Sequence, residues 1–99
     1  MLKKTRSKTK PVTTVTFEVP AEVGADRVFL VGDFNDWSMN KTELAKRKDG
    51  RFSATVQLAP GRYRFRYFLD GDRWENDKEA DDYVSNEFGS EDCVVVIDG

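Results

Sequence analysis

The chain has 99 residues, which is enough for one domain with a single core and too few for a second. It contains no histidine and one cysteine, which excludes an internal disulfide and a Ser-His-Asp triad and leaves tetrahedral zinc almost without ligands. The formal net charge is only −2. We therefore expect a small domain with no metal and no cofactor.

Charge is distributed unevenly along the chain. The first ten positions hold five basic residues and no acidic one, which leaves 11 basic against 18 acidic residues in the rest. This pattern predicts a flexible basic tail over residues 1–11 and a folded domain over residues 12–99. The acidic domain would repel a phosphate backbone, so a nucleic-acid partner is not expected.

The sequence also bears on the location of the protein. No stretch approaches the roughly 20 apolar residues of a membrane span, and no apolar run follows the start Lys3-Lys4 as it would in a secretory signal. A single cysteine, Cys93, fits a reducing compartment. We predict a cytoplasmic protein without membrane contact.

Alternation of apolar and polar residues, the pattern of a half-buried strand, dominates the chain. It predicts strands, in chain order, at residues 12–19, 27–34, 52–58, 62–69 and 93–97. Pro60-Gly61 is a turn signal, and Asp70-Gly71 is expected to close a hairpin. Residues 38–50 are polar with Leu44 as the expected anchor, and within residues 76–91 a short helical turn or strand is expected at 80–83.

Six to eight short strands at this spacing predict an all-β fold, an immunoglobulin-like β-sandwich, with a small barrel as the alternative. Burial of the alternating faces supplies the stability, since a fully buried Phe or Leu contributes roughly 1.5–3 kcal/mol. Cys93 alternates with Val95 and Ile97 and is therefore expected to be a small core residue.

The two tryptophans, Trp37 and Trp74, lie just past strand ends rather than inside the alternating runs. Their rings are therefore expected to be partly exposed, which leaves plain packing and sugar stacking as alternatives. A flat indole can cover the apolar C–H face of a pyranose ring. If about 100 Å² of apolar surface is buried, each ring contributes roughly 2.5 kcal/mol.

Charged residues offer little catalytic chemistry. A glycosidase needs two carboxyl groups flanking a partly dry cleft, whereas the acidic residues here cluster in the turn-rich region 70–82, which is typical of a solvated surface. Of the basic residues Arg62, Arg64 and Arg66 on one strand face, Arg66 lies nearest the turn and is the site candidate. We predict no catalytic residue and no enzyme activity.

Three motifs, taken in order, resemble one family. Residues 28–37 (VFLVGDFNDW), 63–71 (YRFRYFLDG) with Trp74, and 86–95 (NEFGSEDCVV) resemble the glycogen-binding domain of the AMP-activated protein kinase β subunit. They are equally similar to the N-terminal early-set domains of isoamylases and branching enzymes. The resemblance covers residues 14–98 and implies an immunoglobulin-like sandwich that binds glycogen, starch or maltooligosaccharides without hydrolysing them.

The resemblance also implies the binding residues. In the family, two tryptophans stack on glucose rings, a basic residue of the hairpin strand bonds hydroxyls, and an apolar residue of the final loop inserts against the sugar chain. A small hydroxyl residue and an amide complete the set. In that order, these positions hold Trp37 and Trp74, Arg66, Phe88, Ser90 and Asp92.

Two departures from the family pattern affect the site. Asp92 replaces the amide, and a carboxylate only accepts hydrogen bonds where an amide also donates. If the two converge, Asp92 is expected to pair with Arg66 and withdraw it from the sugar. Asp72-Arg73 also places one additional residue before Trp74, which could re-aim its ring.

The predicted function is a non-catalytic α-glucan-binding module whose partners are an α-1,4-glucan and, as a further candidate, a glycogen-metabolising enzyme. The alternative is a protein–protein interaction domain, related to the accessory domains of glycoside hydrolases, in which the sugar site has decayed.

Overall fold

The alternating segments form strands in the computed structural model, which describes residues 2–8 and 11–98. The elements are β1 (Leu2–Arg6), β2 (Thr13–Val19), η1 (Ala21–Val23), β3 (Val28–Gly32), η2 (Asp33–Asn35), β4 (Ala45–Lys46), β5 (Phe52–Leu58), β6 (Gly61–Leu69), β7 (Arg73–Glu75), β8 (Asp82–Ser85) and β9 (Glu91–Ile97). The two η elements are single 3-10 turns. No helix within the described ranges is long and apolar enough to cross a membrane.

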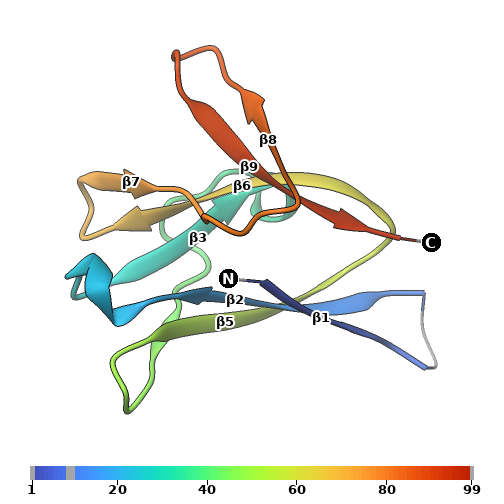
Figure 1. Ribbon diagram of the computed structural model, residues 1–99, viewed down its shortest axis with the longest axis horizontal. Helices are drawn as coiled ribbons and strands as arrows, with labels where there is room; N and C mark the ends of the chain where they lie inside the picture. The colour runs from blue at the N-terminus through green and yellow to red at the C-terminus, as the bar shows by residue number, and fades with distance from the viewer. Residues whose placement is uncertain (1, 9–10, 99) are drawn as a thin grey trace.

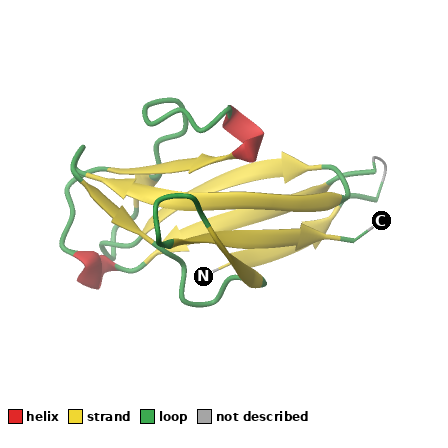
Figure 2. Ribbon diagram, turned by 90° about the horizontal axis from the view of Figure 1, so that it is seen from above, coloured by secondary structure: helices red, strands yellow, loops and turns green. Residues whose placement is uncertain are grey.

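The strands pack as two antiparallel sheets, which is the predicted immunoglobulin-like sandwich rather than a barrel (Figures 1 and 2). One sheet has the order β1-β2-β5-β4. The other has the order β3-β6-β9-β8, and β7 also pairs with β6. Sequence alternation decides which side chains of each strand face the other sheet.

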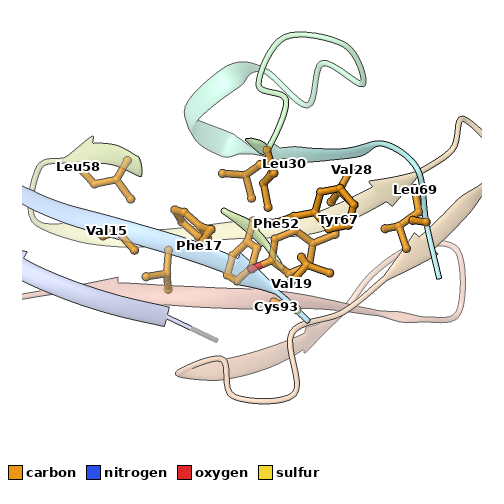
Figure 3. Close-up of a cluster of buried hydrophobic side chains, with 14 of the residues drawn as sticks. Val15, Phe17, Val19, Val28, Leu30, Phe52, Leu58, Tyr67, Leu69 and Cys93 are labelled. Atoms are coloured by element: carbon orange, nitrogen blue, oxygen red, sulfur yellow. The ribbon is translucent and has the colours of Figure 1, made fainter. Parts of the chain in front are cut away.

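Side chains that point between the sheets form the core, as Figure 3 shows. Phe17 of β2 and Phe65 of β6 meet at its centre, with ring centroids 5.1 Å apart and planes at 73°. Cys93 is fully buried, which confirms it as a core residue, and burial raises the pKa of its thiol to about 11. Its thiol is therefore protonated and unreactive in the folded protein at neutral pH.

The predicted basic tail is wrong for Leu2–Arg6, which form β1 and pair with β2 in register from Leu2 opposite Phe17 to Arg6 opposite Thr13. The acidic body of the domain holds the basic strand, through ion pairs of Lys3 with Glu18 at 3.2 Å and of Lys4 with Asp81 at 2.6 Å. Backbone pairing with an edge strand needs no apolar pattern, so sequence alternation gave no sign of it. Residues 1, 9 and 10 of the predicted tail lie outside the described part of the chain.

The two unassigned polar stretches are each tied to a sheet. Leu44 is 2% exposed, as expected for the anchor of residues 38–50, and its amide donates to the carbonyl oxygen of Val28 at 2.8 Å. In the second stretch a strand forms, since β8 begins at Asp82 and pairs with β9.

One edge of β6 is shared by two strands, and this fork positions the site. The first half of β6 pairs with β9 and that ladder ends at Phe65, whereas the second half pairs with β7 from Tyr67 onward. Figure 1 shows β7 and β9 leaving β6 in different directions. Arg66 lies between the two ladders, on the outer face of the sheet.

Candidate functional site

The segment of residues 32–37 (GDFNDW) turns away from the sheet at the end of β3. A Cβ atom on Gly32 would lie 2.5 Å from the carbonyl oxygen of Arg64, so only glycine fits this close approach of two backbones. Phe34 turns back towards the core, where its ring centroid is 5.6 Å from that of Phe17. The segment is thus packed against both sheets.

Asn35, only 7% exposed, closes this turn from the inside. Its Oδ1 accepts a hydrogen bond from the amide of Gly32 at 3.0 Å, and its Nδ2 donates to the carbonyl oxygen of Leu30 at 2.7 Å. The amide of Trp37 donates to the carbonyl oxygen of Gly32 at 2.9 Å. These local bonds set the direction in which Trp37 leaves the sheet.

The β6–β7 hairpin carries the second indole to the outer face of the same sheet. Its turn uses left-handed backbone at Asp70 and Gly71, with φ of 53° and 76°. The register places Trp74 opposite Phe68, and the two rings lie 4.6 Å apart at 41°. Asp72-Arg73, the departure from the family pattern, lead from the turn into β7, and Trp74 is 38% exposed on the outer face.

Arg66 occupies the fork between β7 and β9 and is held from both sides. Its Nε donates to Oδ1 of Asn76 at 2.8 Å, and a terminal nitrogen donates to Oγ of Ser90 at 3.4 Å. Its guanidinium carbon lies 5.5 Å from the ring centroid of Trp74, within range of a cation–π contact. Arg66 thus links the hairpin to the final loop.

The β8–β9 loop is organised by the side chain of Asn86. Its Oδ1 accepts hydrogen bonds from the amides of Phe88 at 3.0 Å and Ser90 at 3.2 Å, and its Nδ2 donates to Oγ of Ser90 at 3.1 Å. Phe88 is 84% exposed, and Figure 1 shows this loop projecting away from the rest of the sandwich. An apolar ring held in water by ordered backbone is typical of a binding surface.

These parts line one groove of about 1110 Å³ on the outer face of the second sheet. The groove brings together all six residues predicted as a site: Trp37, Arg66, Trp74, Phe88, Ser90 and Asp92. Trp37 is partly buried and Trp74 is exposed, so neither indole belongs to the core between the sheets. Six further lining residues were not predicted: Asp33, Met39, Arg64, Ser85, Asn86 and Glu87.

The sequence carried little signal for these additional residues. Asp33, Arg64 and Asn86 have the composition of turns or solvated strand faces, and the partner of Asp33 lies about thirty positions away, at Arg64. Met39 left a weak signal, because it is an apolar residue without an alternating partner in a polar stretch. It is 52% exposed and faces the groove.

Comparison with models of known families matches residues 13–98 to the glycogen recognition site of AMP-activated protein kinase. The chain belongs to this family. The matched range contains both the strands and the loops that line the groove.

Three known proteins illustrate what this chain is similar to. Protein PTST homolog 2, chloroplastic, from Arabidopsis thaliana is 36% identical over 53 residues, which cover 54% of this chain and 10% of the relative. The 5'-AMP-activated protein kinase subunit beta-1 of Homo sapiens is 30% identical over 74 residues, covering 75% and 26%. The 1,4-alpha-glucan branching enzyme GlgB of Aquifex aeolicus is 38% identical over 56 residues, covering 54% and 9%. The chain thus spans a small part of each relative.

Asp92, the departure from the family amide, does not form the expected pair with Arg66. Its Oδ1 accepts a hydrogen bond from Nδ2 of Asn86 at 3.1 Å, and its ion pair, at 3.9 Å, is with the guanidinium of Arg64. Asp92 is 6% exposed, and its hydrogen bond with Asn86 supports the β8–β9 loop. Arg66 therefore keeps its position in the fork.

Several polar side chains of the groove are already hydrogen-bonded within the protein. The carboxylates of Asp33 and Asp92 accept hydrogen bonds from the protein itself, as does the side chain of Asn86. Within residues 2–8 and 11–98, no group of three or more Cys, Asp or Glu side chains is arranged to hold a metal ion. The groove therefore presents aromatic and apolar surface beside an arginine, together with the exposed polar residues Ser85, Glu87 and Ser90.

Proposed function

We propose that the groove binds an α-1,4-glucan chain, such as glycogen, starch or a maltooligosaccharide, with Trp37 and Trp74 stacking on glucose rings. The observation that carries this proposal is that both indoles line one groove on the outer face of a single sheet. Two platforms in one groove suit a chain whose successive rings turn through a helix. The family match supports the same class of ligand.

The other residues of the groove have complementary roles in this proposal. Arg66 uses two of its N–H groups within the protein and directs the remaining donors of its guanidinium to sugar hydroxyls. Phe88 covers an apolar sugar face from the tip of the β8–β9 loop, and Ser90 offers a hydroxyl beside it. Asp92 acts through the loop that it supports.

The expected affinity is moderate. Two stacked rings contribute roughly 2.5 kcal/mol each, against an association cost of about 4 kcal/mol or more. With hydrogen bonding added, the dissociation constant falls between about 1 mM and 10 μM. A module of this strength gains from a polymer that offers many sites, or from a tethered partner such as a glycogen-metabolising enzyme.

The test uses the variants Trp37→Ala and Trp74→Ala. Their binding of maltoheptaose is measured by calorimetry, and their binding of glycogen by migration in gels that contain it. Loss of about 2.5 kcal/mol weakens binding by more than tenfold in each variant, while circular dichroism remains that of a folded sandwich. Tyr83→Ala is the matched control. The exposed fraction of Tyr83, 37%, is nearly that of Trp74. Tyr83 pairs with the buried Cys93, however, and so its side chain lies on the opposite face of the sheet.

Glucan binding that survives both tryptophan substitutions contradicts the proposal. Absence of binding by the unaltered chain favours the alternative of an interaction domain with a decayed site. The proposal includes no catalysis by this domain, so release of sugar from glucan by the purified chain also contradicts it. A cytoplasmic location remains a prediction that rests on the single cysteine, and one relative is named as chloroplastic.

A further inference from the structure

Asp33 uses each of its two carboxylate oxygens as a hydrogen-bond acceptor. Oδ1 accepts from the indole Nε1 of Trp37 at 2.8 Å, and Oδ2 accepts from the backbone amide of Arg64 at 2.7 Å. We propose that Asp33 is a positioning residue that clamps the indole of Trp37 to strand β6 and so presents it for stacking. The proposal rests on the proposed function of the groove.

The backbone at Trp37 explains why a clamp is needed. Asp36 and Trp37 both adopt left-handed conformations, with φ of 57° and 56°. Residues other than glycine rarely take this conformation, bulky ones least of all, and each instance costs on the order of 1–3 kcal/mol. A strained loop does not fix a large ring by itself, so the surrounding bonds must hold it.

Strand β6 is a rigid anchor for this clamp. The ladder between β3 and β6 ends at the pair Gly32 and Phe65, because the chain then turns into η2. The amide of Arg64 comes next along β6, and the side chain of Asp33 replaces the missing backbone acceptor. Arg64 also pairs with Val94 of β9, so the anchor lies inside the sheet.

Two consequences follow from the geometry. Both oxygens of Asp33 already accept protein hydrogen bonds, and the proposal assigns its effect on a sugar to the way these bonds hold Trp37. Because the ring is held before the ligand arrives, binding avoids the cost of ordering it. Loss of the clamp therefore weakens affinity even though the stacking ring itself is still present.

Asp33→Asn is the direct test, since the amide keeps the shape of the side chain but turns a donor towards one of the two N–H groups. We expect about tenfold weaker maltoheptaose binding, as for a platform that must be ordered on association. In the ligand-free protein, the Trp37 indole N–H resonance should move and exchange faster with solvent, and that of Trp74 should not. Trp37→Phe assigns the two resonances.

Asp36→Asn is the matched control, because it removes the same charge from the same loop and asparagine tolerates left-handed backbone. Its affinity should stay within about twofold of the unaltered chain, the usual range for a surface substitution. Equal losses in the two variants would show that charge rather than the clamp matters.

The ligand-free measurement separates this proposal from the function it rests on. If the chain fails to bind glucan but the Trp37 indole is protected and loses protection in Asp33→Asn, the clamp stands and the proposed function falls. If Asp33→Asn weakens binding while the Trp37 resonance is unchanged, the clamp is wrong. Should the variant fail to fold, the unaltered protein still decides, because the clamp requires slower exchange for the Trp37 indole than for that of Trp74.

Discussion

The two faces of strand β6 hold their side chains by different means. On the inner face, Phe65, Tyr67 and Leu69 are at most 2% exposed and are held by burial. On the outer face, Arg64 and Arg66 are held by hydrogen bonds and an ion pair with Asn76, which follows β7, and with Ser90 and Asp92 of the β8–β9 hairpin. The inner face therefore specifies the fold, and the outer face is free to carry recognition.

The largest effect expected from this contrast is on stability. Phe65→Ala removes a ring at the centre of the core and should lower the free energy of unfolding by about 3–5 kcal/mol. Arg64→Ala, one position away on the outer face, should lower it by no more than about 1 kcal/mol, since Arg64 is half exposed, its ion pair spans 3.9 Å, and Asp92 keeps its hydrogen bond with Asn86. Urea denaturation of both variants measures the difference. Similar losses would mean that the outer face also holds the fold together.

The sequence predicted the inner face well because burial imposes a period of two on each strand. The alternation in residues 12–19, 52–58 and 62–69 placed β2, β5 and β6 with the correct side chains inward. It failed for β1, whose sequence Leu-Lys-Lys-Thr-Arg has no such period. That strand forms because backbone pairing with β2 and ion pairs with acidic residues replace apolar burial.

The outer face was predictable only in part: placement at strand ends indicated exposed tryptophans and Arg66 as a candidate, and the resemblance added Phe88, Ser90 and Asp92. Family motifs placed the tryptophans and Arg66 in one site, but they did not reveal what holds them. The bonds of Asp33 and Asn86 depend on strand register and loop closure, which no local pattern encodes. The predicted pair of Asp92 with Arg66 was wrong for the same reason, since the partners of Asp92 in the folded chain are Asn86 and Arg64.

A smaller effect, on binding alone, is expected at Asp92. Asp92→Asn restores a side chain that can donate as well as accept, so maltoheptaose affinity should stay unchanged or rise by about threefold, one good hydrogen bond at the low end of its range. Calorimetry at fixed pH measures it, and Glu91→Gln is the control that removes the same charge from the neighbouring exposed position. A clear loss of affinity would make Asp92 a direct sugar ligand.

The smallest expected effect is on stability at low pH, through Asp70 in the turn that places Trp74 on the outer face. Oδ1 of Asp70 accepts hydrogen bonds from the amides of Arg27 and Asp26, both at 2.9 Å, and these bonds lower the pKa of the carboxyl group. A carboxyl whose pKa is lower in the folded state stabilises the fold above its unfolded pKa. That contribution is lost as the pH falls through the folded-state pKa.

Between neutral pH and about pH 2, the free energy of unfolding should therefore fall less steeply for Asp70→Asn than for the unaltered chain. Urea denaturation at each pH measures it. Asparagine tolerates the left-handed backbone of this position, so the substitution tests the charge and not the turn. Asp72→Asn removes the same charge from the same turn without touching the two amides. If all three proteins lose stability in parallel, the hydrogen bonds of Asp70 do not depend on its charge, and the outer face gains nothing from a carboxylate at this turn.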